Sequence, residues 1–180
     1  MTHSIVIAGF GGQGVLFAGR LIAYTAMSEG KNVTWFPSYG PEVRGGTCNC
    51  HVIISDKQIG NPIVSHADSA LILNLQSLDK FEDKVKPGGN ILIDGSIVKK
   101  ELTRKDINGV IIPASDIAEE IGNRSLSGMV VLGEFARLTG AVGLENLIAA
   151  MKSHISASKA ELAEINEKML RANTKDTVGG

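Results

Sequence analysis

Two short stretches of this sequence contain residue types whose spacing is suited to binding a ligand. The first has the spacing G-x-G-x-x-G and reads Gly9-Phe10-Gly11-Gly12-Gln13-Gly14, between a short apolar run and an amphipathic stretch. Glycine allows a tight turn and close approach of a ligand to the backbone. The start of a helix offers unpaired N–H groups and a positive dipole end to an anion. Gly9, Gly11, Gly12, Gln13 and Gly14 are therefore candidate cofactor-binding residues.

Three interpretations of this glycine-rich loop stay open. A dinucleotide site needs an acidic residue about 20 positions further on, at the end of the second strand, to hold the ribose hydroxyls. Here that stretch reads Thr34-Trp35-Phe36-Pro37, with neither an acid nor an arginine for a 2′-phosphate. The pattern therefore disfavours NAD(P). The glycines either serve only close packing of strand and helix, or bind an anion or a cofactor shared with a partner, which is the favoured interpretation.

The second stretch runs from Ser38 to Gly46 and combines large functional side chains with glycines and prolines that exclude regular structure. Loops carry function more often than the elements they connect. The alternative is an ordinary polar connection with a Glu–Arg surface pair. The candidate binding residues in this loop are Tyr39, Glu42, Arg44 and Gly45.

The elements that must position both loops follow from the hydrophobic pattern. Apolar or alternating runs predict strands over 4–8, 32–36, 47–55, 70–73, 91–93 and 110–112, and the stretch 14–29 has helical spacing. Pro87-Gly88-Gly89 predicts a turn, and the chain beyond Pro113 is helical in pattern. Strands that alternate with helices indicate an α/β fold with a mostly parallel, doubly wound (Rossmann-like) sheet and a helical C-terminal third. Both loops follow strand ends, so they are expected at the same rim of the sheet.

Length and composition narrow the class of protein. The chain has 180 residues, 43% hydrophobic and 21% charged, with a net charge of −1. This predicts one globular domain over 1–172 with a flexible tail at 173–180. A pI of about 6.4 argues against nucleic-acid binding. We read no signal peptide and no stretch long enough to span a membrane, so a cytoplasmic location is expected.

The two loops together resemble the gamma subunit of the 2-oxoacid:ferredoxin oxidoreductases. The resemblance rests on the glycine-rich loop through Val15 and on Ser38-Tyr39-Gly40-Pro41-Glu42-Val43-Arg44-Gly45-Gly46, and it extends to about Gly143. The second loop is more similar to the 2-oxoglutarate and branched-chain 2-oxoacid enzymes than to the pyruvate enzyme. One departure is Gly128, where many relatives have Asn.

The resemblance implies a reaction carried out by a complex. In this reaction a 2-oxoacid, coenzyme A and oxidised ferredoxin give an acyl-CoA, carbon dioxide and reduced ferredoxin. The implied cofactors are thiamine diphosphate, Mg²⁺ and [4Fe–4S] clusters. The implied partners are alpha and beta subunits that hold thiamine diphosphate, and a ferredoxin-like cluster subunit or ferredoxin. A homodimer formed through the complex is a further option.

The sequence indicates that this chain holds none of these cofactors alone. Its two cysteines, Cys48 and Cys50, cannot ligate a cluster that needs four thiolates, and they are expected to be buried core thiols on one strand face. The thiamine-diphosphate motif is missing, since Asp94-Gly95 lacks the required continuation, and the four histidines show no metal-ligand spacing. We therefore expect no catalytic residue and no metal ligand here, and an inactive isolated chain.

Within the complex, the glycine-rich loop is expected to receive a polar part of coenzyme A or to line the wall beside thiamine diphosphate. Arg44 is expected to contact an anionic group, with Glu42 orienting it. The alternative function is a stand-alone nucleotide-binding oxidoreductase that uses the same loop.

Overall fold

The computed structural model describes residues 1–38, 46–172 and 174. Its strands are β1 (Thr2–Phe10), β2 (Asn32–Ser38), β3 (Thr47–Ser55), β4 (Ala67–Ile72), β5 (Val85–Asp94) and β6 (Asn108–Ile112). Its α-helices are α1 (Val15–Ser28), α2 (Leu75–Phe81), α3 (Ala114–Ile121), α4 (Ser127–Thr139), α5 (Leu144–His154) and α6 (Ala160–Arg171). Three 3-10 turns, η2 (Glu82–Lys84), η3 (Arg124–Leu126) and η4 (Ala157–Lys159), join some of them. Of the predicted tail, only Thr174 is among the described residues.

The strands form one sheet in the order β2-β3-β1-β4-β5-β6. β1, β4, β5 and β6 are parallel, whereas β3 pairs antiparallel with both β1 and β2. β2 therefore runs in the same direction as β1, and β3 alone is reversed. The predicted α/β fold with a mostly parallel sheet is confirmed.

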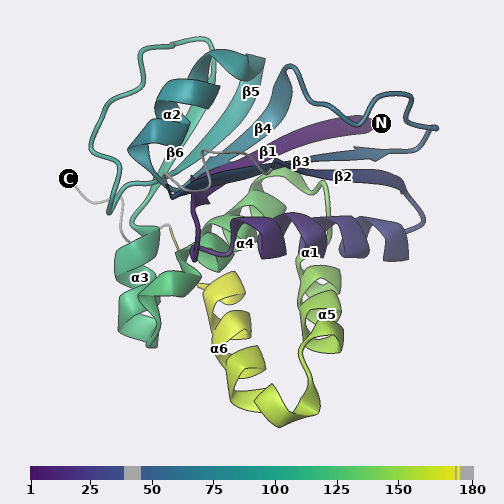
Figure 1. Cartoon of the computed structure of the whole chain (residues 1–180), viewed down its shortest axis with the longest axis vertical. Coiled ribbons are helices and arrows are strands. Elements are labelled where there is room, and N and C mark those ends of the chain that lie inside the picture. Colours follow the sequence, from purple (N-terminus) through teal and green to yellow (C-terminus); the bar gives the residue numbers. More distant parts are fainter. Residues whose placement is uncertain (39–45, 173, 175–180) are drawn as a thin grey trace.

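Helices cover both faces of the sheet, as expected for a doubly wound fold (Figure 1). α1 and α4 lie against one face, with α3, α5 and α6 beyond them, and α2 lies on the other face. The larger core, on the α1 side, includes Ile5, Leu21, Val131 and Phe135, and the smaller core on the α2 side includes Val6, Leu78 and Phe81. Alternate residues of β1 from Ile5 to Ala8 thus enter different cores, which is why this part of the strand is a continuous apolar run.

The sheet departs from the sequence prediction at Pro87-Gly88-Gly89. These residues lie inside β5 rather than in a turn between elements, and the pairing with β4 shifts there, from Ala67–Val85 to Ser69–Asn90. Gly88 has φ +75°, and its N–H donates to the Asp106 carbonyl at 2.7 Å. The proline and the two glycines therefore make an irregular segment inside a strand that continues beyond it.

The carboxyl end of β5 is tied to the helical third through Asp94, which is fully buried. One carboxylate oxygen accepts the N–H groups of Ser96 and Ser115, both at 3.1 Å, and the other accepts the Ser115 hydroxyl at 2.5 Å. Asp94 thus satisfies the N–H of Ser115, in the first turn of α3.

No helix within the described ranges is both long and apolar enough to cross a bilayer.

Candidate functional site

The glycine-rich loop lies where an α/β sheet usually binds its ligand. In the sheet, β2 and β3 lie on one side of β1, and β4, β5 and β6 lie on the other. The strand order therefore changes direction between β1 and β4, which is where such folds usually bind ligands. Residues 11–14 connect the carboxyl end of β1 to α1. Gly12 and Gly14 have φ +92° and +78°, conformations that side chains other than glycine rarely adopt. These two residues explain why glycine is needed in the turn.

The Gln13 side chain closes the crevice between the two strand ends. Its Oε1 accepts the Phe10 N–H at 2.6 Å, and its Nε2 donates to the Leu73 carbonyl at 3.1 Å. Leu73 directly follows β4, and its own N–H donates to the Ala8 carbonyl at 2.9 Å. The amide that the sequence offered as a ligand contact thus makes two bonds within the protein and stabilises the loop.

The start of α4 packs behind the same loop through Gly128. A Cβ atom at position 128 would lie 2.6 Å from the Gln13 carbonyl oxygen and 3.4 Å from the Leu73 Cδ1 atom. This contact is tighter than real Cβ atoms show, so any side chain here would displace the loop or the helix. Glycine at position 128, where many relatives have Asn, therefore allows α4 to approach the glycine-rich loop closely. The sequence alone did not indicate this role.

The prediction that the two loops lie at the same rim of the sheet is confirmed for Gly46, the last residue of the second loop. The Gly11 N–H donates to the Gly46 carbonyl at 2.7 Å, and Phe10 faces Thr47 in the β1–β3 pairing. Gly9 lies inward, where a Cβ would be 2.8 Å from that of Leu73. The candidate residues Tyr39, Glu42, Arg44 and Gly45 lie outside the described residues.

The outward side of the loop is what remains for a ligand. Gly11 and Gly12 are exposed, and no atom of the described residues lies within 4 Å of a Cβ built on Gly12. α1 begins directly after Gly14, which has no side chain to cap the helix. The first N–H groups of α1 therefore point toward the loop. Exposed glycines before an uncapped helix start suit an anionic or polar group approaching from outside.

The same geometry argues against a dinucleotide in the usual crevice. In that arrangement the second strand lies beside the first and its end reaches the ribose. Here β3 separates β2 from β1, so β2 forms the edge of the sheet. Gln13 also occupies the space between the β1 and β4 ends.

Sequence reasoning missed the segment after β4. Asn74 is fully buried, and its Oδ1 accepts the Ser77 N–H at 2.8 Å, which caps α2. Its Nδ2, like the buried Ser127 hydroxyl at the start of α4, has no hydrogen-bond partner in the structure as described. An asparagine between an apolar run and a helical pattern is a recognisable N-cap signal that would have located this segment.

His51 has a structural role in the fold. Its Nδ1 accepts the Val64 N–H at 3.1 Å. Burial, assisted by the charges of Lys84 and Lys80, lowers the pKa of His51 below its usual value. The neutral ring therefore anchors the segment before β4.

Across the described ranges, no group of three or more His, Cys, Asp or Glu side chains is placed to hold a metal ion.

The cysteines do not suit a cluster site. Cys50 is fully buried in the larger core with Val52 and Ile54, as predicted, whereas Cys48 is only half-buried, so the prediction of two buried thiols is wrong for Cys48. Cys50 Sγ donates to the Val15 carbonyl at 3.6 Å. Burial raises the pKa of Cys50 to about 12, and it also raises the pKa of Cys48.

We expect the Cys50 thiol to resist alkylation in the folded protein. With a pKa of about 12, its thiolate fraction at pH 8 is below that of an ordinary cysteine by roughly a thousandfold. Labelling of Cys48→Ala, which leaves Cys50 alone, should therefore be slower than labelling of Cys50→Ala, and denaturant should abolish the difference. Equal native rates for the two variants would contradict the burial of Cys50.

Comparisons with known proteins agree with the sequence resemblance. A profile of the pyruvate ferredoxin/flavodoxin oxidoreductase family matches residues 4–175. Ketoisovalerate oxidoreductase subunit VorA of Methanothermobacter thermautotrophicus is 39% identical over 173 residues. These residues cover 95% of this chain but 35% of VorA, so the chain spans about a third of that relative's length.

Other relatives match this chain over most of their own length. 2-oxoglutarate synthase subunit KorC of Methanocaldococcus jannaschii is 35% identical over 164 residues, covering 89% of this chain and 88% of KorC. A crystal structure of the gamma subunit of a keto/oxoacid ferredoxin oxidoreductase from Geobacter sulfurreducens superposes with a TM-score of 0.81 at 32% identity and covers 94% of both chains. The chain belongs to the pyruvate ferredoxin/flavodoxin oxidoreductase family and matches KorC and the Geobacter gamma subunit over most of their length.

Proposed function

We propose that this chain is the gamma-type subunit of a thiamine-diphosphate-dependent 2-oxoacid:ferredoxin oxidoreductase. The complex would convert 2-oxoglutarate or a related 2-oxoacid, with coenzyme A, to an acyl-CoA and carbon dioxide while reducing ferredoxin. Its location would be cytoplasmic. The likeness to KorC and to the Geobacter gamma subunit over most of their length supports this function over a stand-alone nucleotide-binding enzyme.

In this proposal, thiamine diphosphate, Mg²⁺ and the iron–sulfur clusters are held by other subunits. The two cysteines are too few for a [4Fe–4S] cluster, and one of them is buried in the core. Asp94, the acid of the Asp-Gly pair, already accepts three hydrogen bonds as part of the fold. Alpha and beta subunits would therefore hold thiamine diphosphate and Mg²⁺, and a ferredoxin-like subunit or ferredoxin would carry the clusters.

The role of this chain would be to present the glycine-rich loop to the active site. The single observation that carries this role is that Gln13 closes the inner crevice while Gly11 and Gly12 stay exposed on the outer side. A phosphate or another polar part of coenzyme A would approach that outer side and the start of α1. Arg44 would add a charge-assisted contact from the neighbouring loop, oriented by Glu42, with Tyr39 and Gly45 completing the wall.

Gly12→Ala is expected to impair the complex by more than its effect on folding. The methyl group at φ +92° strains the loop by about 1 kcal/mol and occupies the space left for the ligand. The KM for coenzyme A should rise by about tenfold or more. Gly88→Ala is a matched control, because Gly88 also has a positive φ of +75° and no atom within 4 Å of its Cβ, but lies in the amino half of β5.

Arg44→Ala tests the second loop in the same assay. Loss of a charge-assisted hydrogen bond costs about 1.5–3 kcal/mol, or roughly ten- to hundredfold in affinity or rate. Arg124→Ala is its control, since Arg124 is an exposed residue whose surface ion pairs contribute little. If Gly12→Ala and Arg44→Ala assemble and turn over like their controls, the loops only pack and bind no ligand.

A further inference from the structure

A groove follows the side of α1 that carries Phe17, Tyr24 and Met27, and one part of it reaches Val33 and Trp35 of β2. It consists of four depressions, of about 110, 480, 200 and 380 Å³, that share lining residues and so lie next to one another along the helix. Phe17, Tyr24 and His154 each line more than one of them. The groove begins at Gly14, beside the glycine-rich loop, and ends at Met27. We call it the α1 groove. Over 13 positions of α1 its length is roughly 20 Å.

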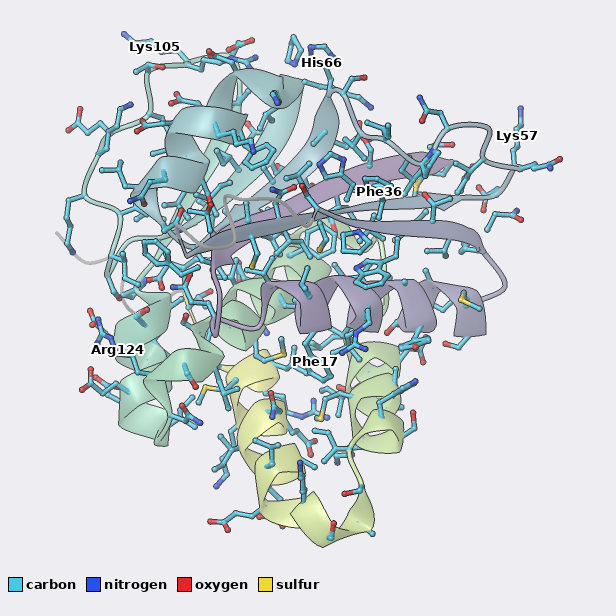
Figure 2. All side chains as sticks on the ribbon, in the orientation of Figure 1. Phe17, Phe36, Lys57, His66, Lys105 and Arg124 are labelled. Carbon is cyan, nitrogen blue, oxygen red and sulfur yellow. The ribbon has the colours of Figure 1, made fainter. Side chains whose placement is uncertain are left out.

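The floor and walls of the α1 groove are largely apolar. Phe17, Tyr24 and Met27 project from one side of α1, and Leu162 of α6 lines the largest depression together with Phe17. Tyr24, Met27 and Leu162 are 41%, 60% and 36% exposed, although each is large. Tyr24 also stacks on His154 at the end of α5, with ring centroids 4.1 Å apart. In Figure 2, Phe17 lies below α1, above the gap between α5 and α6.

The charges of the α1 groove all have one sign. Among the described residues that line the four depressions there is no aspartate or glutamate, whereas Arg20 and Lys159 are both present. The other arginines of the described chain each form an ion pair, namely Arg104, Arg124, Arg137 and Arg171. Within the described residues, Arg20 and Lys159 form none. The groove thus combines exposed apolar anchors with two cations that form no ion pair with any described residue.

We infer that the α1 groove is a docking surface for an acidic amphipathic helix of another subunit of the complex. This inference rests on the proposed function, which supplies the partner. A helix of about four turns fits the groove's length, with its apolar face on Phe17, Tyr24 and Met27 and its carboxylates beside Arg20 and Lys159. In VorA the region like this chain is 35% of a longer polypeptide, so there it has further protein attached to it.

A second copy of this chain fits the α1 groove less well. In a twofold-symmetric pair the same surface faces itself, which would set Arg20 and Lys159 against the same cations of the other copy. Like charges at an interface cost several kcal/mol. The cations of the groove therefore select a partner that supplies carboxylates.

The test is binding of this chain to the other chains of its complex, purified together without it. Arg20→Glu/Lys159→Glu should weaken binding by about tenfold or more and reduce its dependence on salt. Lys57→Glu/Lys105→Glu is the control, because it changes the net charge equally at exposed lysines that lie well away from Phe17 in Figure 2. It should stay within about twofold of wild type. Arg20→Lys/Lys159→Arg keeps both charges and should bind like wild type.

The apolar anchors give a second, independent readout. Tyr24→Ala/Met27→Ala should weaken binding by about tenfold or more, whereas Ile63→Ala, at a side chain that is 54% exposed elsewhere, should not. Each variant is first shown to unfold at the wild-type temperature. The inference is overturned if the groove variants bind like their controls while wild type forms an active complex, a result that leaves the proposed function intact. If wild type itself fails to bind the other chains, the proposed function fails as well.

Discussion

Gly133→Ala is expected to destabilise the protein by about 2–4 kcal/mol, because α4 and α6 touch at this position without room for a side chain. A Cβ on Gly133 would overlap the Leu170 carbonyl oxygen and lie 2.8 Å from the Leu170 carbonyl carbon. Since these are backbone atoms, α6 as a whole would have to move. The same carbonyl accepts Arg137 Nη1 at 2.9 Å, and Met169 and Leu170 are fully buried, so displacement of α6 would also disturb these contacts.

Thermal or urea unfolding measures this effect. For a chain of this length the loss corresponds to a decrease in Tm of roughly 5–10 °C. Gly60→Ala is the matched control, because Gly60 lacks a positive φ and has no atom within 4 Å of a Cβ. If Gly133→Ala unfolds within about 0.5 kcal/mol of that control, the close contact between α4 and α6 is not part of the folded state.

Gln13→Glu is expected to lower the turnover of the assembled complex by about tenfold or more. The carboxylate keeps the size of the amide and still accepts the Phe10 N–H, but its second oxygen would face the Leu73 carbonyl oxygen across 3.1 Å. Loss of the donor leaves two acceptors opposed, at a cost of roughly 1–3 kcal/mol. The hydrogen bond between Gln13 and the Leu73 carbonyl would break, and the glycine-rich loop would shift from its position on the rim.

The matched control is Gln76→Glu, the same chemical change at an exposed position in α2. Both variants would be assayed for oxoacid-dependent reduction of an electron acceptor after assembly, and for stability alone. If Gln13→Glu retains wild-type turnover, the activity of the complex does not depend on the hydrogen bonds of Gln13 or on the loop geometry that they stabilise.

Much of the fold was predictable because its signals are local. The alternation over residues 47–55 gave the bounds of β3, and the helical spacing of 14–29 differed from α1 by one residue at each end. The glycine-rich loop was recognisable for the same reason, since its turn is formed by neighbouring residues. The reversed placement of β3 between β1 and β2 was not, because strand order depends on pairing between distant segments.

The parts of the candidate site that escaped prediction are contacts across the chain. Gln13 was expected to offer its amide to a ligand, yet its partner Leu73 lies 60 positions away in sequence. Gly128 was noted only as a departure, because its packing against Gln13 arises when α4 folds back onto the loop. Pro87-Gly88-Gly89 has the composition of a turn, but pairing of the flanking residues with β4 keeps it within a strand.

The most direct test of the proposed function is an omission assay with the reconstituted complex. The other subunits would be supplied with 2-oxoglutarate or a branched-chain 2-oxoacid, coenzyme A, thiamine diphosphate, Mg²⁺ and an artificial electron acceptor, with and without this chain. We expect acyl-CoA formation and acceptor reduction only when this chain is present, and no activity from this chain alone. Full activity without it, or oxidoreductase activity of the isolated chain with NAD(H) or NADP(H), would contradict its proposed function as a gamma-type subunit.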